Sequence, residues 1–339
     1  MRALVTGGAG FIGSHVAEEL VRRGAAVTVL DDLSGGFAEN VPAGARLVEG
    51  SILDEALVQR LFRDERFEYV YHLAAYAAEG LSHFIRGFNY RNNLIGSMVL
   101  INQALRHDVR CFVFTSSIAV YGSQQTPMRE EATPQPEDPY GIAKYAVELD
   151  LQAAHRLFGL NYLIFRPHNV YGERQNVGDR YRNVIGIFMN QVMRGEPMTI
   201  FGDGSQTRAF SYIGDVAPDL VAASLRPETY NQVFNVGGDE VCSVKDLAER
   251  VARVFGVRPA IRFLEARHEV AHAFASHDRL ARFLGRRPTT PLDEGLRRMA
   301  RWAQQHGPRQ SRPFERIEVD RNLPPSWRAV TGAGEGGQA

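Results

Sequence analysis

Tyr140 and Lys144 are the two residues of this chain whose types and spacing most suggest joint chemistry. They lie four apart at the start of a predicted helix, so their side chains are one turn apart on the same face. A phenol with a pKa of about 10 is a poor base at neutral pH, but an adjacent ammonium group stabilises the phenolate. The pair could therefore take a proton from an alcohol. An exposed helical pair without function is the alternative, because this spacing is common by chance.

Ser117 is the third candidate catalytic residue. It ends the run Thr115-Ser116-Ser117, which follows a predicted buried strand at 111–115. Its hydroxyl could hydrogen-bond the reacting alcohol and the carbonyl oxygen that forms from it, although a loop serine that only satisfies backbone groups would look the same. The catalytic interpretation gains weight because Lys144 is one of only two lysines, the other being Lys245.

Three glycines upstream indicate a phosphate-binding turn. Gly7, Gly10 and Gly13 stand at three-residue intervals directly after the first predicted strand and at the start of the first helix. Gly7 permits the tight turn, Gly10 lets the backbone approach a pyrophosphate, and Gly13 lets the helix pack close to the strand. The helix N-terminus favours an anion. Such turns also use glycine for purely steric reasons, so the context decides.

Asp31 and Asp32 supply that context, because they end the second predicted strand about twenty residues further on. A carboxylate there can accept hydrogen bonds from an adenosine ribose and would repel a 2′-phosphate, which favours NAD over NADP as the cofactor. The alternative is a solvated acidic turn. Asp54 could similarly meet the adenine or simply cap the following helix.

Alternating strands and helices must position these residues. Strands are expected at 3–6, 26–30, 46–48, 69–74, 111–115 and 162–165, and helices at 11–23, 55–62, 89–107 and 140–158. This alternation predicts an α/β fold, a Rossmann-type doubly wound parallel sheet with ligands at the carboxyl ends of its strands.

The pattern becomes less regular after Gly172. An Arg-rich loop is expected at 173–183, followed by helices at 184–193, 214–225, 244–255 and 292–305 and a strand at 198–201. We therefore expect an NAD-binding domain at 1–172, to which some later segments return. A smaller, interleaved C-terminal substrate-binding domain should lie mainly at 173–306. Residues 307–339 are rich in Pro, Arg and Gly and are expected to form a partly disordered tail.

Composition excludes several classes of partner. Lys+Arg and Asp+Glu both number 39, so no global field attracts the chain to nucleic acid or to a membrane surface. Only Cys111 and Cys242 are present, which favours reduced thiols, and no Cys/His spacing suggests a metal site. Neither a signal-peptide pattern nor a long apolar run is found, so a cytoplasmic location is expected.

Together these motifs closely resemble the extended short-chain dehydrogenase/reductase family of nucleotide-sugar enzymes, over roughly Met1 to Trp302. The motifs are the glycine turn, His72-Leu73-Ala74-Ala75, Ser117, Tyr140-x-x-x-Lys144, Arg166-Pro167-His168-Asn169, Phe201-Gly202-Asp203-Gly204 and Phe234-Asn235-Val236-Gly237. The best subfamily match is to UDP-sugar 4-epimerases. With the glycine turn, the resemblance implies a cofactor site made of Gly7, Gly10, Phe11, Ile12, Gly13, Asp31, Asp32, Ser51, Ile52, Leu73, Ala74, Ala75, Asn93, Tyr140, Lys144 and Pro167.

The resemblance also implies a site for a UDP-sugar. Besides Ser117, it assigns Asn169, Arg208 and Arg267 to the diphosphate and Glu269 to the uridine ribose. Arginine forks suit a dianionic diphosphate. For Arg267 and Glu269, a surface ion pair is the alternative.

Ile118 and Ala119 narrow the reaction. Relatives that dehydrate or decarboxylate their sugar carry acidic residues at these positions, whereas this chain has none there. We therefore expect oxidation and re-reduction at C4. In this cycle Tyr140 removes the O4 proton as a hydride leaves for NAD, the keto sugar turns over, and the hydride returns to the other face.

The identity of the sugar stays open between two readings. Ala273 stands where relatives use small residues to admit bulky sugars. Arg174, with Arg180 and Arg182, could instead pair a C6 carboxylate, although a solvated loop is the commoner explanation. UDP-glucose/UDP-galactose is the favoured pair and UDP-glucuronate/UDP-galacturonate is close behind.

Two other functions are possible: a net NAD-dependent dehydrogenase or reductase, and a non-catalytic NAD(H)-sensing module. The resemblance also implies a homodimer, formed through the helices at 89–107 and 140–158.

Overall fold

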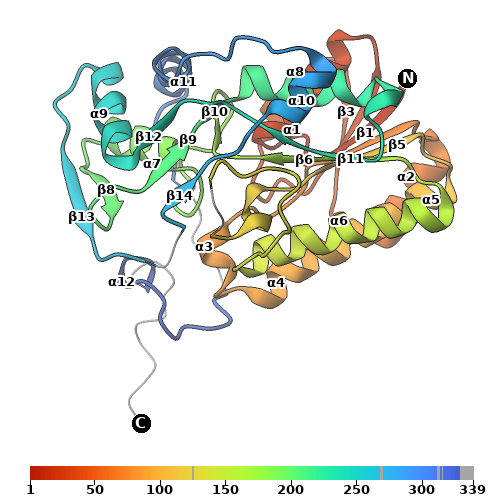
Figure 1. Cartoon of the computed structure of the whole chain (residues 1–339), viewed down its shortest axis with the longest axis horizontal. Coiled ribbons are helices and arrows are strands. Elements are labelled where there is room, and N and C mark those ends of the chain that lie inside the picture. Colours follow the sequence, from red (N-terminus) through yellow and green to blue (C-terminus); the bar gives the residue numbers. More distant parts are fainter. Residues whose placement is uncertain (124–125, 268–269, 311–313, 315, 329–339) are drawn as a thin grey trace.

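A seven-stranded parallel sheet forms the centre of the larger domain (Figure 1). The computed structural model describes residues 1–123, 126–267, 270–310, 314 and 316–328. The strands are β1 (Arg2–Thr6), β2 (Ala26–Asp31), β3 (Ala45–Glu49), β4 (Tyr69–His72), β5 (Cys111–Thr115), β6 (Tyr162–Pro167) and β11 (Gln232–Val236), in the order β11-β6-β5-β4-β1-β2-β3. This order reverses beside β1, as in the Rossmann fold, and confirms the predicted fold class.

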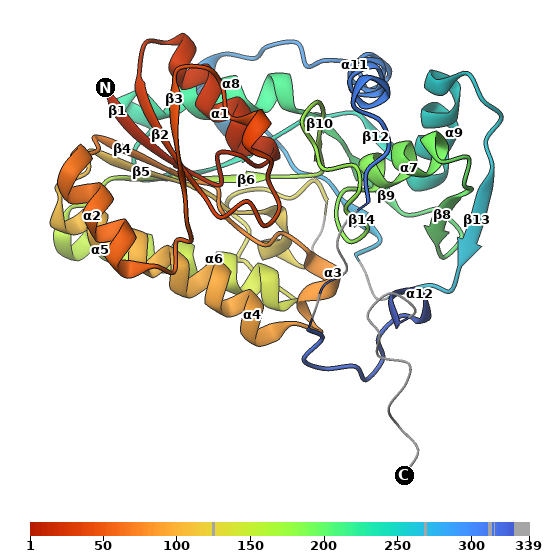
Figure 2. The ribbon, with the colours of Figure 1, turned by 180° about the vertical axis from the view of Figure 1, so that it is seen from behind.

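The helices cover both faces of the sheet (Figure 2). Helices α1 (Phe11–Arg22) and α8 (Ile213–Ser224) pack on one face, and α2 (Glu55–Glu65), α5 (Gly96–Arg106) and α6 (Pro139–Phe158) on the other. Side chains alternate along β1, so that Ala3 and Val5 enter one core and Leu4 the other. Both faces are therefore apolar, as a sandwiched parallel sheet requires.

Local signals set the ends of the helices that carry the candidate site. Asp138 caps α6, its carboxylate accepting from the Gly141 amide, and Gly159 ends the same helix with positive φ. Asp54 caps α2 by accepting from the Leu57 amide, as its capping interpretation predicted.

The single helix expected at 89–107 is wrong in its detail. The structure has α4 (Arg86–Tyr90), a π-helical turn (Arg91–Ile95) and then α5. The apolar periodicity that predicted one helix continues through the turn. In the turn, each backbone amide bonds the carbonyl five residues earlier instead of four. π-turns often occur beside functional sites.

The smaller domain is built from short elements around α7 (Val184–Met193), α9 (Val244–Phe255) and α11 (Leu292–His306). Strand β8 (Met198–Phe201) pairs with β13 (Ile261–Leu264), and β9 (Thr207–Ala209) pairs with β12 (Val241–Ser243) and β14 (His272–Ala273). The remaining elements are β7 (Val170–Tyr171), β10 (Ser211–Tyr212), α3 (Glu79–Ser82), α10 (Asp278–Leu284), α12 (Pro325–Arg328) and 3₁₀ turns at Ala38–Asn40, Ile118–Tyr121 and Pro227–Thr229. Strand β11 returns to the large sheet from this part of the chain, which interleaves the two domains.

The described part of the C-terminal tail packs against the body, since Leu323 and Trp327 are buried in a cluster with Leu81 and Ile85. The last residues, 329–339, lie outside the described residues. Cys111 and Cys242 are buried and unbonded to each other, in line with reduced thiols. Across the described residues, no helix is long and apolar enough to cross a membrane.

Candidate active site

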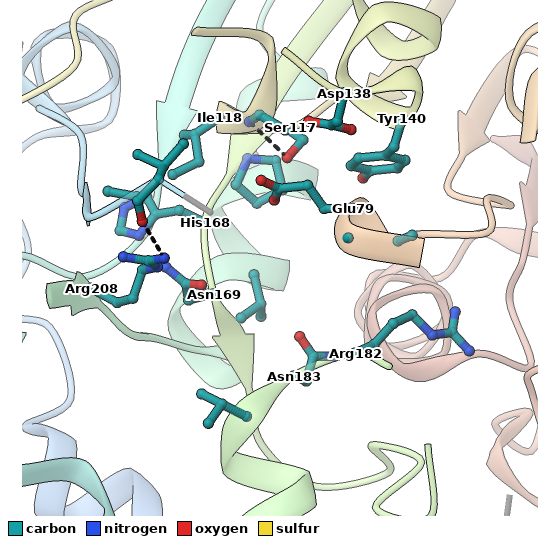
Figure 3. Close-up of a pocket in the computed structure, with 18 of the residues that line it drawn as sticks. Glu79, Ser117, Ile118, Asp138, Tyr140, His168, Asn169, Arg182, Asn183 and Arg208 are labelled. Carbon is teal, nitrogen blue, oxygen red and sulfur yellow. Dashed lines mark hydrogen bonds between the residues drawn. The ribbon is translucent and has the colours of Figure 1, made fainter. Parts of the chain in front are cut away.

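A cavity of about 390 Å³ lies at the carboxyl ends of β1, β4, β5 and β6, where the smaller domain meets the sheet. Residues of both domains line it, including Ile12 and Leu73 on the sheet side and Arg208 and Arg267 on the other. In Figure 3 the side chains of Ser117, Tyr140, Glu79 and Asp138 gather at one end, and Asn169 and Arg208 lie at the other. The predicted catalytic residues Ser117 and Tyr140 therefore lie at one end of the cavity, and the predicted diphosphate contacts Asn169 and Arg208 lie at the other.

The predicted catalytic residues meet in this cavity. Ser117 follows β5, and Tyr140 and Lys144 project from the first turns of α6. The Lys144 Nζ lies 5.8 Å from the centre of the Tyr140 ring and donates a 2.7 Å hydrogen bond to the Thr115 carbonyl. The Ser117 hydroxyl accepts from the Ala119 amide, 3.1 Å away, which fixes its direction.

Burial opposes charge on both members of the Tyr140–Lys144 pair. It raises the pKa of Tyr140, while the Ser117 hydroxyl acts to lower that pKa and the carboxylates of Glu79 and Asp138 raise it. Burial also lowers the pKa of Lys144 to about 7, against the opposing effect of the Glu148 carboxylate. Burial therefore disfavours an isolated Tyr140 phenolate and an isolated Lys144 ammonium, and each charged form is stabilised when the other is present.

A buried ion pair supports α6 from below. Glu148, one turn beyond Lys144, accepts hydrogen bonds from Arg166 Nε at 3.0 Å and from the Ser116 hydroxyl at 2.5 Å. The Arg166 guanidinium also lies 4.7 Å from the centre of the Tyr121 ring. Because Glu148 and Arg166 are almost fully enclosed, this network holds α6 in fixed register against β5 and β6.

The glycine turn has the geometry that a pyrophosphate needs. Gly7 has a φ of +71°, and a Cβ on Gly13 would stand 2.1 Å from the Gly7 carbonyl oxygen, so neither position tolerates a side chain. No side chain of the described residues caps the N-terminus of α1. The free amides and the helix dipole therefore remain available to an anionic cofactor beside Phe11 and Ile12, which line the cavity.

Asp31 ties the end of β2 to this turn. Its carboxylate accepts from the amides of Ala9 and Leu33, each at 2.9 Å, and burial raises its pKa. Asp32 is exposed beside it and accepts from the Ser34 amide and hydroxyl. Both carboxylates thus stand at the strand end where a ribose would lie.

The other predicted cofactor residues divide into two groups. Leu73, Ala75 and Pro167 line the cavity, together with Phe11 and Ile12 and the Tyr140–Lys144 pair, whereas the three glycines of the turn, Asp31 and Asp32 do not. Ala74, Ser51 and Ile52 do not line it; the Ala74 amide donates to Thr6, and Ser51 accepts from the Leu53 amide.

Asn93 is placed differently from the prediction. It is 1% exposed. Its side-chain oxygen accepts a hydrogen bond from the Tyr76 amide, and its side-chain nitrogen donates to the Tyr76 carbonyl and to the Asn89 side-chain oxygen. It therefore fixes the loop after β4 instead of facing the cavity. The sequence could not show this, because the partner loop is 17 residues away.

Asn169 and Arg208, at the opposite end, and Arg267 also line the cavity, and their contacts with a diphosphate remain a prediction. Asn169 has a φ of +42° and donates to the Ala209 carbonyl at 3.1 Å. Arg208 is held by the carbonyls of Val270 and Ala271, at 2.5 and 2.9 Å. The Arg267 guanidinium stacks 4.4 Å from the centre of the Phe201 ring. Two positive charges on fixed supports suit a diphosphate.

Arg174, which was predicted to meet the substrate, does not line the cavity. Its guanidinium pairs with Glu18 on α1 at 2.7 Å and reaches the Ser14 carbonyl. It thus joins the loop to the larger domain, with a partner 156 residues earlier in the chain. Glu269 lies outside the described residues.

The structure adds residues that the motifs did not select. Glu79, Asp138 and His83 line the cavity near Tyr140, and so does Arg182, from the loop expected to hold arginines. Of the three loop arginines considered, Arg182 alone lines the cavity, and Asp179 pairs with it at 2.6 Å. Only their position in the fold reveals Glu79 and Asp138, since neither belongs to a recurring pattern. Within the described residues, no cluster of His, Cys, Asp and Glu could hold a metal ion.

The fold and this site define an extended short-chain dehydrogenase/reductase: a Rossmann sheet, a glycine turn, and a Ser, Tyr and Lys set at the carboxyl ends of its strands. The model of the NAD dependent epimerase/dehydratase family matches residues 3–237. The chain therefore belongs to this family, and its cofactor is NAD.

Individual relatives agree with this assignment. The chain is 35% identical over 266 residues to a UDP-glucose 4-epimerase of Streptomyces lividans, covering 75% of this chain and 80% of that protein. Among solved structures, the UDP-glucose 4-epimerase of Thermotoga maritima with UDP-glucose has a TM-score of 0.86 at 36% identity, over 90% of this chain and 99% of that one. The UDP-glucuronic acid 4-epimerase of Bacillus cereus, with UDP-glucuronic acid and NAD, has a TM-score of 0.82 at 28% identity, over 90% and 100%.

Proposed function

We propose that this chain interconverts UDP-glucose and UDP-galactose by inverting the sugar at C4. The relatives that carry UDP-sugar 4-epimerase names support the reaction, and the chain has no acid at Ile118 or Ala119 to divert it. The charge around Tyr140 supports a neutral sugar.

The catalytic side chains suit this reaction. Tyr140 accepts the proton of the sugar O4, Lys144 stabilises the phenolate, and Ser117 hydrogen-bonds the oxygen as it becomes a carbonyl. The glycine turn and the end of β2 would hold NAD, which when bound would supply the acceptor for the C4 hydride and the donor for its return to the opposite face of the ring. Tyr140 then gives its proton back to O4, so no proton is consumed overall.

The other end of the cavity must hold the substrate while the 4-keto sugar turns over. Asn169, Arg208 and Arg267 are assigned this role, since each is supported by other protein groups and lines the cavity. Asn169 and Arg208 lie across the cavity from Tyr140 (Figure 3). An anchored diphosphate leaves rotation of the sugar as the remaining freedom and prevents loss of the intermediate.

One observation carries the choice of sugar. The carboxylates of Glu79 and Asp138 lie close enough to Tyr140 to raise its pKa, and each has a larger effect than the Arg182 guanidinium, which lowers it, so negative charge outweighs the arginine at the sugar end. A C6 carboxylate would meet two like charges there. Arg182, which could have compensated, is already paired with Asp179.

UDP-glucuronate is the second candidate, because Arg182 lines the same cavity and the Bacillus relative is named for that substrate. Exchange of Asp179 for the substrate carboxylate would bring Arg182 into use. Ala273, which is small and lines the cavity, would also leave room for an N-acetylated sugar.

The test is to incubate the purified chain with NAD and separately with UDP-glucose, UDP-glucuronate and UDP-N-acetylglucosamine. Products are separated by chromatography while the absorbance of NADH is followed. Conversion of UDP-glucose to UDP-galactose without NADH accumulation is expected. Preferential conversion of UDP-glucuronate would reject the neutral-sugar proposal, NADH accumulation would identify a net dehydrogenase, and binding without turnover would identify a sensing module.

A further inference from the structure

A C-terminal strap, formed by the described residues among 309–328, passes from the smaller domain over the larger one and back. At its start, the backbone amide of Arg309 donates to Asn190 on α7 at 3.0 Å. The Arg309 guanidinium lies 4.0 Å from the centre of the Phe37 ring and pairs with Glu39 at 2.8 Å, both beyond β2. The strap thus joins the two domains as soon as it leaves α11.

The middle of the strap is fixed to α4. Phe314 packs edge-on against Phe88 and also against Tyr76, with ring centres 4.9 and 5.4 Å apart. The Glu318 carboxylate accepts hydrogen bonds from the amides of Gly87 and Phe88, at 2.5 and 2.8 Å, in the first turn of that helix. These contacts combine apolar burial with a charged cap.

The end of the strap reaches the wall of the cavity. Trp327 is 4% exposed, with its ring centre 5.3 Å from that of Tyr181, and the Arg267 guanidinium lies 5.9 Å from it. A Cβ on Gly80 would be 3.5 Å from the same indole. Tyr181, Arg267 and Gly80 all line the cavity and come from three distant segments. Figures 1 and 2 show α12, which carries Trp327, between α3 and β13.

The two aromatic residues of the strap, Phe314 and Trp327, are each linked to a different arginine that lines the cavity. Trp327 lies next to Arg267, which is proposed to bind the diphosphate. Phe314 packs on Tyr76, whose ring lies 5.0 Å from the Arg182 guanidinium, at the proposed sugar end. Arg267 stacks on Phe201 at 4.4 Å and has the Trp327 ring as a second aromatic neighbour at 5.9 Å. Aromatic neighbours restrict the orientation of a guanidinium and lower the entropy that it loses on binding an anion.

We infer that Trp327, held by the strap, is a positioning residue for the nucleotide-sugar: it orients Arg267 toward the diphosphate and keeps the wall formed by Gly80 and Tyr181 in place. The inference rests on the proposed function only in taking the ligand to be a uridine diphosphate. The Thermotoga relative is matched over 99% of its length by 90% of this chain, so this chain has residues beyond the shared fold. The resemblance seen in the sequence ends near Trp302, before the strap begins.

The experiment compares Trp327→Ala and Trp327→Phe in the full chain with Trp302→Ala. Trp302, the only other tryptophan, stacks on His306 in α11 and does not line the cavity, so its removal controls for general loss of packing. UDP affinity is measured by titration calorimetry, and KM and kcat for the epimerised sugar are measured alongside. A further pair of chains, ending after Gln310 and after Arg328, separates the strap from the residues that follow it.

Trp327→Ala is expected to weaken UDP binding about tenfold and to raise KM similarly, with kcat within about twofold, because uniform binding is lost. Trp327→Phe should recover most of the affinity, the chain ending after Arg328 should bind as the full chain does, and the chain ending after Gln310 should resemble Trp327→Ala. Unchanged UDP affinity in folded Trp327→Ala, or equal loss in Trp302→Ala, would overturn the inference. If Trp327→Ala does not fold, the UDP affinity of Trp327→Phe is compared with that of the chain ending after Gln310. Equal affinities would then overturn the inference.

The outcomes also separate this inference from the proposed function. Weaker UDP binding in the strap variants, with no turnover of UDP-glucose by the full chain, would retain the strap and reject the proposed substrate. Normal epimerisation of UDP-glucose, with a UDP affinity that does not change when Trp327 is replaced, would retain the proposed function and reject the role of Trp327.

Discussion

Tyr140 is the side chain on which the proposed proton transfer depends. Tyr140→Phe removes the phenolic oxygen and leaves the ring, so we expect kcat to fall by about 10²- to 10⁴-fold, the usual contribution of a general acid–base. The measurement is chromatographic conversion of UDP-glucose under saturating NAD. NAD binding should persist in the variant, and turnover close to that of the unmodified chain would show that another group moves the proton.

Lys144 gives a prediction about stability and pH. Its folded-state pKa of about 7 lies below the value of 10.5 expected when unfolded. Between these values the unfolded chain binds more protons, so the destabilisation due to Lys144 is complete below pH 7 and disappears as pH rises toward 10.5. Lys144→Met should therefore abolish activity yet stabilise the cofactor-free chain at pH 6, by on the order of a few kcal/mol.

Thermal unfolding at pH 6 and pH 9 measures this effect. The melting temperature of Lys144→Met should exceed that of the unmodified chain by more at pH 6 than at pH 9. Lys245→Met, whose side chain lies outside the cavity, serves as the control. An equal difference at both pH values would contradict the burial argument.

Residues whose roles depend on local spacing were predictable from the sequence. The Tyr140–Lys144 pair and the glycine turn belong to single helix starts, and the cavity is lined by the catalytic pair and by Phe11 and Ile12 beside the turn. The positions of Arg174 and Asn93 were not predictable, because partners distant in the sequence determine where their side chains point. Arg174 pairs with Glu18, and Asn93 bonds the Tyr76 backbone. Glu79 was missed for the same reason.

At the scale of elements, the close approach of α1 to β1 determines whether the cofactor can bind. Gly13→Ala would place a methyl group 2.1 Å from the Gly7 carbonyl oxygen, so the helix must move away from the turn. We expect NAD affinity to fall at least about tenfold, since the amides would leave their anion-binding positions. Fluorescence titration with NADH measures this loss.

Gly186→Ala on α7 is the matched control. It is also a glycine inside a helix, but a Cβ there would make only ordinary contacts, at 3.5 Å with Gln175. This variant should bind NADH as the unmodified chain does. Equal affinities for the two variants would show that the turn tolerates a displaced helix.

Long elements were predicted better than short ones for a physical reason. Helices α7 and α9 have the predicted bounds, because ten or more residues of apolar periodicity define a face. The two- and three-residue strands β7, β9, β10, β12 and β14 are too short to show any period. They form because the folded chain brings suitable partners together, and β7, β9 and β14 contribute Val170, Arg208 and Ala273 to the cavity.

At the scale of the whole molecule, an apolar surface remains uncovered on the helices expected to form a dimer. Helix α6 exposes 46% of Leu149, 76% of Leu157 and 64% of Phe158, and Ile95 beside α5 is 51% exposed. Helices α5 and α6 pack against each other, and three of these side chains lie on α6. A patch of this kind is typical of an interface, and two copies related by a twofold axis would form a four-helix bundle.

Leu149→Glu should therefore convert a dimer of this chain into monomers, because the twofold axis places two buried carboxylates in one small interface. Sedimentation equilibrium across a range of concentrations measures the change. Val241→Glu is the matched control, since Val241 is 41% exposed but lies on β12 in the smaller domain. A monomeric unmodified chain, or a dimer that both substitutions leave intact, would contradict the predicted interface, and dissociation by Val241→Glu alone would move it to the smaller domain. Because α6 also carries Tyr140 and Lys144, a loss of activity in the Leu149→Glu monomer would show that pairing of these helices helps to hold the catalytic pair in place.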